Sequence, residues 1–264
     1  MREIVLDVEV IESLTDNYIW LFVNYTESSA FVVDPGEASA VLNWLKKRKI
    51  NLLGILITHH HPDHTMGVED LVVYYDVPVY GPHNSPANCI TKKLRENDDL
   101  LLHGNRFSVI EVPGHTSDHI AYFSSSSFGG NHILFAGDTL FGGGCGRLFE
   151  GTAHQMHSSL GKIKRLPQNT LIYSGHEYTI ANLNFARSVE PNNDKLTKRY
   201  QDDCQKRNMN KPTLPSLLSL ERDTNPFLRV SKESVISAVH KKFNINDCSE
   251  QAVFEALRKW KDIF

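Results

Sequence analysis

The chain has 264 residues, of which 41% are hydrophobic and 22% are charged, and its formal net charge is −3. This length and composition allow one large domain with a full core, or one domain with an appendage, and exclude disordered and collagen-like classes. No apolar run reaches about 18 residues, so we expect no transmembrane helix. The sequence has no basic tract interleaved with aromatic residues of the kind that would indicate nucleic-acid binding.

The first residues, Met1 to Glu3, lead directly into strand-like sequence and do not resemble a signal peptide. The chain has four cysteines without paired spacing, Cys89, Cys145, Cys204 and Cys248. Disulfides are rare in the cytoplasm, and Cys145 is best interpreted as a small packed residue. We therefore expect a cytoplasmic monomer with no membrane and no nucleic-acid partner.

The first half of the chain alternates predicted strands and helices. Alternating or continuous apolar patterns predict strands, and apolar residues with helical spacing predict helices. The predicted strands are Ile4 to Val10, Tyr18 to Val23, Phe31 to Val33, Leu52 to Ile57 and Val77 to Tyr80, and the predicted helices are Ala38 to Arg48 and Val68 to Tyr75. Mixed elements of this kind favour a layered αββα arrangement.

Three further predicted strands each run into a glycine followed by a histidine or an aspartate. They are Phe107 to Val112 before Gly114-His115-Thr116, His132 to Gly137 before Asp138-Thr139, and Thr170 to Tyr173 before Gly175-His176-Glu177. A glycine at such a position lets the backbone approach a site closely. The serines 124–127 between these strands predict an exposed turn.

Helical patterns dominate the last third of the chain. They cover Ala181 to Val189, Lys195 to Arg207, Ser231 to Phe243 and Glu250 to Trp260. We therefore expect a catalytic domain over residues 1–178 and a helical, substrate-binding region over residues 179–264.

The most informative segment runs from Thr58 to His64, where four potential metal ligands occupy six residues: His59, His61, Asp63 and His64. They follow a predicted core strand, and in extended chain His59 and His61 would share one face while His60 points away. Imidazole and carboxylate groups suit zinc, iron and similar ions. Together with His115, Asp138 and His176, they provide seven ligands, enough for two ions that share a bridging carboxylate.

These motifs resemble the metallo-β-lactamase superfamily and, within it, glyoxalase II, the hydroxyacylglutathione hydrolase family. The closer likeness rests on the following segments: Gly137 to Phe141, Cys145 to Thr152, Gly175 to Ile180, Thr213 to Ser216 and Asn225 to Arg229. The resemblance implies an α+β, four-layer αββα metallo-β-lactamase-like sandwich with a helical C-terminal region. It also implies a thioesterase that hydrolyses S-(2-hydroxyacyl)glutathione, with S-D-lactoylglutathione as the expected substrate.

By this resemblance, two divalent ions are bound, with zinc expected and iron or manganese as alternatives. Metal one would take His59, His61 and His115, metal two would take Asp63, His64 and His176, and Asp138 would bridge them. A metal-bridging hydroxide would attack the thioester carbonyl. Asp63 would also accept a hydrogen bond from this hydroxide, which makes Asp63 and Asp138 the predicted catalytic residues.

The resemblance also assigns a clamp for the carboxylates of glutathione. Its residues are Arg147, Phe149, Tyr178, Arg258 and Lys261. Arginine and lysine form charge-assisted bonds to carboxylates, although a charged terminal helix such as 250–260 can equally present a solvated face. Phe149 stands where some family members have tyrosine, so a phenolic hydrogen bond worth about 0.5–1.5 kcal/mol would be absent.

Several assignments remain open at this stage. Asp34 could orient the ligand loop or only form a turn. Asp118 precedes His119 where the family often has glycine, and because aspartate tolerates a left-handed turn better than most residues, we expect the loop to be preserved. His60 is expected to lie behind the ligands or in solvent. Alternative functions are a persulfide dioxygenase, a phosphodiesterase or nuclease of the same superfamily, and a non-catalytic metal-binding domain.

Overall fold

The computed structural model describes residues 5–264, and the chain forms two compact units. The N-terminal unit contains the chain up to Glu111 together with Asp118–Gly137, and the C-terminal unit contains Val112–Ser117 together with Asp138–Phe264. Ile4, at which the first predicted strand begins, lies outside the described residues.

The first sheet of the N-terminal unit has six strands in the order β1-β2-β3-β4-β5-β6. They are β1 (Leu6–Ser13), β2 (Asn17–Asn24), β3 (Ser29–Val33), β4 (Asn51–Leu56), β5 (Val79–Pro82) and β6 (Lys92–Leu94). The first three strands pair antiparallel, and β3 to β6 pair parallel. All eight residues of β2 are buried, as a strand covered on both faces requires.

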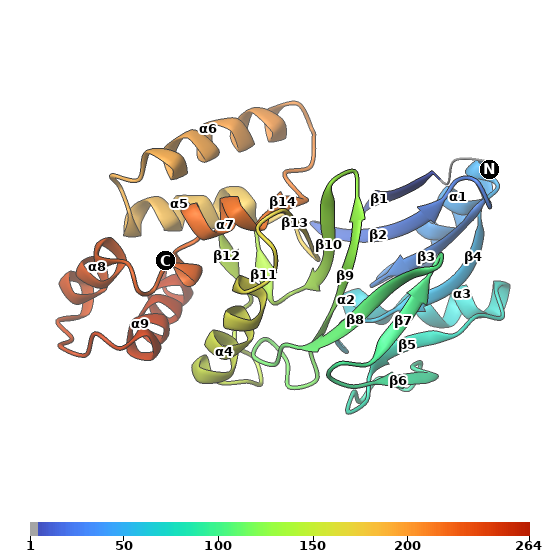
Figure 1. Cartoon of the computed structure of the whole chain (residues 1–264), viewed down its shortest axis with the longest axis horizontal. Coiled ribbons are helices and arrows are strands. Elements are labelled where there is room, and N and C mark those ends of the chain that lie inside the picture. Colours follow the sequence, from blue (N-terminus) through green and yellow to red (C-terminus); the bar gives the residue numbers. More distant parts are fainter. Residues whose placement is uncertain (1–4) are drawn as a thin grey trace. The chain divides into compact units, whose positions relative to one another are not determined.

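One face of this sheet is covered by the helices α1 (Ala38–Arg48) and α3 (Val68–Tyr74), which Figure 1 shows beside the blue strands. Leu21 of β2 and Ile55 of β4 share a buried cluster with Leu45 of α1 and Leu71 of α3. Each such buried aliphatic side chain contributes roughly 1.5–3 kcal/mol. The predicted helices over these residues are confirmed.

A meander of four antiparallel strands lies against the other face: β7 (Asp99–Leu102), β8 (Asn105–Glu111), β9 (Ile120–Phe128) and β10 (Asn131–Gly137). The contact is aromatic, because the ring of Phe22 lies 5.3 Å from that of Phe107, and Phe107 stacks on Phe135 at 6.0 Å. The N-terminal unit is therefore a stack of helices, sheet and second sheet.

The predicted turn at serines 124–127 is wrong, because these residues continue β9 and Ser124 is fully buried. The turn lies instead at Gly129 and Gly130, whose φ angles are 58° and 88°. A two-residue hairpin loop needs positive φ at both positions, which glycine adopts without strain. The Gly-Gly pair was the better signal.

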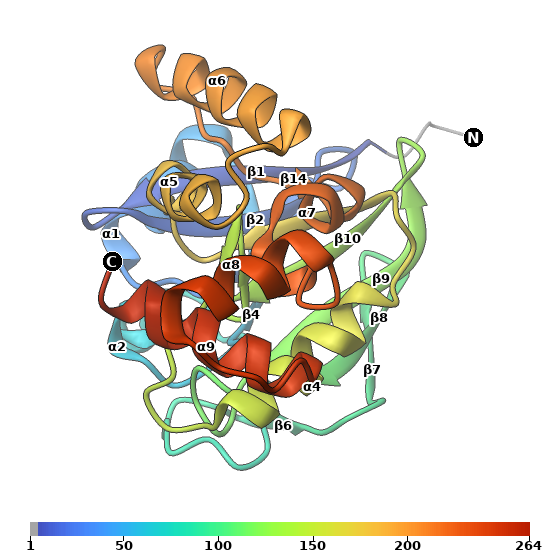
Figure 2. The same ribbon diagram turned by 90° about the vertical axis from the view of Figure 1, so that its left-hand side faces the viewer.

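The C-terminal unit is mainly helical. Its elements are β11 (Leu140–Phe141), β12 (Gly144–Cys145), α4 (Ala153–Lys164), β13 (Thr170–Ser174), α5 (Thr179–Val189), α6 (Asp194–Asn208), β14 (Ser216–Leu217), α7 (Leu218–Thr224), the 3₁₀ helix η1 (Pro226–Leu228), α8 (Glu233–Phe243) and α9 (Glu250–Asp262). Figure 2 shows α8 and α9 side by side, and α5 packs on α6 through a small buried cluster around Leu183. The four predicted helices of this region are confirmed.

Three helices were not predicted: the single turn α2 (Pro62–Thr65), α4 and α7. The signal for α4 is Thr152, whose hydroxyl accepts from the Gln155 amide while the Gln155 side chain accepts from the Thr152 amide. This reciprocal capping box marks a helix start even where the apolar periodicity is weak. Among the described residues, no helix is long and apolar enough to cross a membrane.

A buried polar network joins α6 and α7 to the β11–β12 hairpin. The carboxylate of Glu221 accepts from Arg199 at 2.5 Å, from Ser216 at 2.6 Å and from the Gly143 amide at 2.9 Å. Arg199 also donates to Thr224 at 2.7 Å. Because both charges are buried, each depends on the other for compensation.

We expect Arg199→Met to lower the free energy of unfolding by about 3–5 kcal/mol, because Glu221 would keep a buried charge without its main partner. Urea denaturation followed by circular dichroism measures the change. Lys198→Met is the matched control, since Lys198 is exposed on the same helix and forms a surface ion pair with Asp202, and it should change stability by less than about 1 kcal/mol. Equal losses in both variants would contradict the assigned role of the network.

Candidate metal centre

Four candidate ligands of the N-terminal unit lie in the loop after β4 and in the short helix α2. His59 Nε2 lies 3.1 Å from His61 Nδ1, and the rings of His59 and His64 are 4.3 Å apart. Asp63 Oδ2 lies 3.4 Å from His64 Nε2. The structure thus brings His59, His61, Asp63 and His64 together within this unit.

The backbone brings His59 and His61 together in a different way from the strand alternation that the sequence suggested. The strand ends at Leu56, the chain bends at Thr58 and His59, and His61 is the N-cap of α2 with Pro62 in the first turn. Proline suits this position because its missing amide hydrogen would have no acceptor there. His59 and His61 therefore meet through a bend and a helix start, and strand alternation is the wrong explanation.

Asp34, at the end of β3, fixes this loop. Its carboxylate accepts from the Thr58 amide at 2.8 Å and from the Thr58 hydroxyl at 2.7 Å, and it lies 3.1 Å from His64 Nδ1. A carboxylate beside Nδ1 favours the tautomer that leaves Nε2 free to bind a metal. Asp34 has a φ of 51°, so it both forms the turn and orients a ligand.

Gly36 allows the turn after Asp34 to approach the ligand loop closely. A Cβ at this position would lie 1.9 Å from the carbonyl oxygen of Asp63. Asn17 also fixes Asp63, because its side-chain amide donates to Oδ2 at 2.9 Å. Sequence reasoning missed Asn17, because nothing in the pattern links it to a residue 46 positions away.

His60 is partly buried and contacts the buried carboxylate of Asp118 at 2.9 Å. Asp118 is absent from the non-glycine residues with positive φ in the described chain, so the loop uses no left-handed turn at this residue. His119 is fully buried and stacks on His59, with ring centroids 4.6 Å apart. The aspartate therefore serves His60, and His119 supports the position of a ligand ring.

The C-terminal unit brings together His115, Asp138 and His176. Asp138 Oδ2 lies 3.4 Å from His115 Nε2 and 3.2 Å from His176 Nε2. His115 Nδ1 faces the carbonyl oxygen of Arg147 at 2.7 Å, which leaves Nε2 as its ligand atom. One carboxylate oxygen between two imidazoles is the arrangement that a bridging ligand needs.

The predicted clamp residues also lie in the C-terminal unit, with unequal exposure. Arg147 and Phe149 are exposed, and Tyr178 stacks on His176 with ring centroids 4.8 Å apart. Phe149 packs edge-on against His115 at 5.3 Å. Phe149 and Tyr178 thus each lie beside one of the candidate ligands, His115 and His176.

Arg258 differs, because it is only 5% exposed. Its guanidinium donates to the Cys145 carbonyl at 3.1 Å and to Asp262 at 2.8 Å, and Asp262 also lies 3.6 Å from Arg147. Burial raises the pKa of the Cys145 thiol to about 11, so this cysteine is a packed, protonated residue at neutral pH.

Burial lowers the pKa of Lys261, and the neighbouring Arg258 and Arg147 lower it further. Its ammonium lies 5.5 Å from the centre of the Phe185 ring and 5.8 Å from that of Phe264. Lys261 is therefore a half-buried cation on an aromatic surface, unlike a solvated lysine on a helix face.

The profiles of two known protein families together match residues 15–264. The profile of the metallo-β-lactamase superfamily matches residues 15–176, and that of the hydroxyacylglutathione hydrolase C-terminus matches residues 177–264. The chain is 44% identical to the hydroxyacylglutathione hydrolase of Chromohalobacter salexigens, over 98% of this chain and 100% of the relative. It is 46% identical to that of Alkalilimnicola ehrlichii, over 97% of this chain and 98% of the relative.

Solved structures agree in fold. ETHE1 from Myxococcus xanthus aligns with a TM-score of 0.65 at 23% identity, over 97% of this chain and 99% of that chain. The BLEG-1 B3 metallo-β-lactamase aligns with a TM-score of 0.64 at 24% identity, over 84% of this chain and 99% of that chain. The predicted α+β, four-layer αββα metallo-β-lactamase-like sandwich with a helical C-terminal region is confirmed.

Identity above 40% to named hydrolases across nearly the full length exceeds what a shared fold alone would give. The chain belongs to the hydroxyacylglutathione hydrolase family of the metallo-β-lactamase superfamily, and it is an enzyme.

Proposed function

We propose that this enzyme hydrolyses S-(2-hydroxyacyl)glutathione, with S-D-lactoylglutathione as the expected substrate, to D-lactate and glutathione. This reaction would complete the detoxification of methylglyoxal. The observation that carries the proposal is the 44% identity, over 98% of the chain, to a relative named hydroxyacylglutathione hydrolase. The match of residues 177–264 to the C-terminus of that family supports the same substrate class.

Seven residues would hold two divalent ions. His59, His61 and His115 would bind the first, Asp63, His64 and His176 the second, and Asp138 would bridge both. The donor set fits such ions, because it consists of imidazoles and carboxylates and leaves room for water. Zinc is the expected metal, with iron or manganese as alternatives.

When bound, the two ions supply a hydroxide near neutral pH and stabilise negative charge on the carbonyl oxygen. Asp63 would accept a hydrogen bond from the nucleophile through the carboxylate that Asn17 holds in place. The oxygen of the nucleophile bonds to the thioester carbon, the carbon–sulfur bond breaks, and glutathione leaves as its thiolate. A thiol pKa near about 8.5 makes this departure easy without a strong acid.

The clamp would bind the carboxylates of the glutathione moiety. Arg147 and Lys261 offer cations to the substrate, Tyr178 offers its hydroxyl, and the Phe149 ring offers apolar contact. Arg258 would act mainly by fixing Asp262, which in turn lies beside Arg147.

We assign residues 1–178 to the catalytic domain and residues 179–264 to a substrate-binding helical region. This boundary is supported by the two family profiles, which meet between residues 176 and 177. It differs from the division into compact units, because the C-terminal unit includes His115, Asp138 and His176. A monomer acting in the cytoplasm fits the four free cysteines and a glutathione-linked substrate.

Turnover of the proposed substrate tests the thioesterase. Purified enzyme loaded with zinc should hydrolyse S-D-lactoylglutathione at the same rate with and without oxygen, followed as loss of thioester absorbance. Asp138→Ala should lower kcat by several orders of magnitude, because the ions would lose their shared ligand. No turnover in a sample that holds two metals per chain would reject the thioesterase, and oxygen consumption with a persulfide substrate would favour the dioxygenase.

A second prediction concerns Asp34, which is not a proposed ligand. Asp34→Ala should weaken metal binding by about 10–100-fold, because His64 and Thr58 lose the carboxylate that orients the loop. Metal content measured against a competing chelator reports the change. Asp70→Ala removes an exposed carboxylate of α3 and should leave affinity unchanged, so similar losses in both variants would argue against this role.

The lowered pKa of Lys261 predicts that substrate binding weakens at alkaline pH. Lysine is cationic below its pKa, so the carboxylate contact is lost as pH rises through a value below the ordinary one of about 10.4. KM should therefore rise on the alkaline side while kcat changes little. In Lys261→Arg the cation persists and this rise in KM should disappear.

The control for this measurement is Lys259→Arg, which changes an exposed lysine two residues away. It should keep the alkaline rise in KM. If Lys261→Arg and Lys259→Arg give the same profile as the unchanged enzyme, Lys261 does not bind the substrate.

A further inference from the structure

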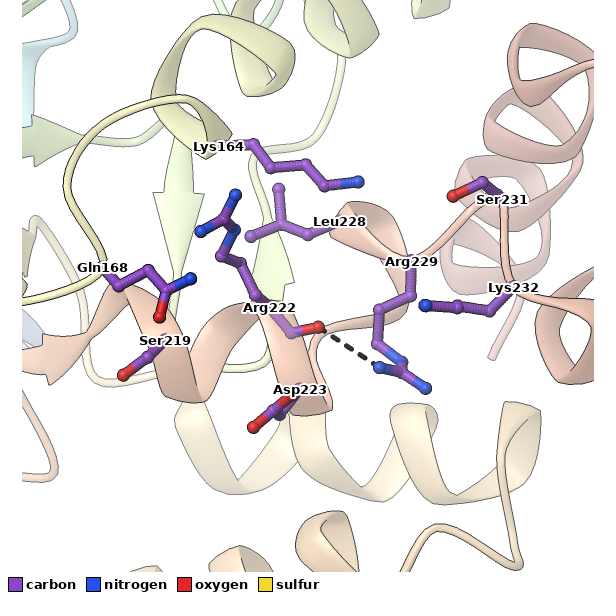
Figure 3. A pocket seen from close by; sticks show the side chains of 9 residues that line it. All are labelled: Lys164, Gln168, Ser219, Arg222, Asp223, Leu228, Arg229, Ser231 and Lys232. Carbon is purple, nitrogen blue, oxygen red and sulfur yellow. Dashed lines mark hydrogen bonds between the residues drawn. The ribbon is translucent and has the colours of Figure 1, made fainter.

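The C-terminal unit contains a polar cavity built from residues that take no part in the proposed reaction. Its volume is about 330 Å³. Figure 3 shows the cationic side chains around it: Lys164 at the end of α4, Arg222 on α7, Arg229 after η1 and Lys232 before α8. The fold thus collects four cations from four elements around one hollow.

Two of the charged groups around this cavity are already neutralised. Arg229 binds Glu190 through two hydrogen bonds of 2.7 and 2.9 Å, and it also donates to the carbonyl oxygen of Arg222. Asp223, the one carboxylate of the lining, pairs with Lys195 at 2.6 Å. These pairs fix the wall of the cavity and contribute little net charge to it.

The other three cations have no such compensation. Within residues 5–264, we find no acceptor at hydrogen-bond or ion-pair distance from the side chains of Lys164, Arg222 and Lys232. Lys164 and Arg222 are half-buried, which limits the water that can solvate them. Like charges held around one cavity repel each other, and an anion between them would relieve this repulsion.

The positive charge of the cavity lining contrasts with the net negative charge of the chain. The sequence carries a net charge of −3, yet this cavity has three uncompensated positive charges and no free carboxylate. The hydroxyls of Ser219 and Ser231 and the amide of Gln168 lie on the same lining and can donate hydrogen bonds, and Leu228 is its one aliphatic residue. The chemistry selects a compact, highly charged oxyanion over an apolar ligand.

We propose that this cavity binds a small phosphate-bearing molecule through Lys164, Arg222 and Lys232. A phosphomonoester carries about −1.5 to −2 charges at pH 7, and its three oxygens match an arginine fork with two lysine point charges. The cavity is large enough to take more than the phosphoryl group, so a sugar-sized phosphomonoester fits it better than free phosphate. This inference does not depend on the proposed thioesterase activity.

The test measures binding of a sugar phosphate and of inorganic phosphate to the metal-loaded enzyme by isothermal titration calorimetry at low ionic strength. Citrate serves as the carboxylate comparator. We expect saturable binding that is tightest for the sugar phosphate and that weakens as salt is added. Tighter binding of citrate than of either phosphate would overturn the assignment of ligand class.

Variants locate the binding. Arg222→Gln and the double variant Lys164→Gln with Lys232→Gln should each weaken it by at least about tenfold, the usual effect of losing a charge-assisted hydrogen bond. Lys198→Gln removes an exposed lysine of the same unit that does not line the cavity, and it should leave binding unchanged.

The variants matter because phosphate can also bind a metal centre. Binding that persists unchanged in Arg222→Gln and in the double lysine variant would place the anion elsewhere and reject the cavity. The absence of saturable binding by either phosphate would reject it as well. All these side chains lie at the rim or half-buried, so the variants are expected to fold normally, and thermal unfolding checks this.

Discussion

Three of the candidate metal ligands, His64, Asp63 and His115, are each held by a second polar group. Asp34 lies against Nδ1 of His64, Asn17 donates to Asp63, and the Arg147 carbonyl faces Nδ1 of His115. Without such partners an imidazole can rotate or change tautomer, and its ligand nitrogen is no longer directed to one place. The elements around each unit's ligands can be understood as the means of supplying these partners.

The partners come from positions that are remote in sequence and fixed by the sheets. Asp34 ends β3 and the ligand loop follows β4, and these two strands pair in parallel. Their carboxyl ends therefore meet at one edge of the sheet, where the apolar cluster with α1 and α3 keeps both strands rigid. Packing of Leu21, Ile55 and Leu71 in this cluster thus stabilises the sheet from which Asp34 and the ligand loop extend.

The sequence predicts a helix or strand well where its apolar residues repeat with one clear spacing. It predicts poorly where contacts with residues distant in sequence determine the local structure. The predicted helix Ala38 to Arg48 matches α1 because its apolar residues repeat with helical spacing, and charged residues fill the outer face. Serines 124–127 mislead, because β9 continues through them: Ser124 pairs with Phe107 of β8 and Ile133 of β10, and pairing with β10 resumes at Phe128 after an irregularity. At Ser124, pairing with strands on both sides overrules local propensity.

The same distinction holds for the candidate site. The crowding of histidines from His59 to His64 is visible in six consecutive letters, whereas the contacts of Asn17 with Asp63 and of His60 with Asp118 span 46 and 58 residues. No spacing rule reveals such pairs, because Asn17 begins β2, His60 and Asp63 follow β4, and Asp118 precedes β9. Asp118 illustrates the difficulty, because composition suggests a turn former while the structure uses its carboxylate.

Two groups of cations in the C-terminal unit differ in how much charge they leave for a ligand. Around Arg147, Arg258 and Lys261, the carboxylate of Asp262 already neutralises one charge, and the pKa of Lys261 is lowered by burial and, to a smaller extent, by the two neighbouring arginines. Around Lys164, Arg222 and Lys232, no carboxylate is free to do so. Attraction scales with the product of the charges, so the first group suits singly charged carboxylates and the second suits a more highly charged phosphoryl group. In a chain with net negative charge, two proposed anion sites can therefore prefer different ligands, because neighbouring carboxylates neutralise a different share of the positive charge in each.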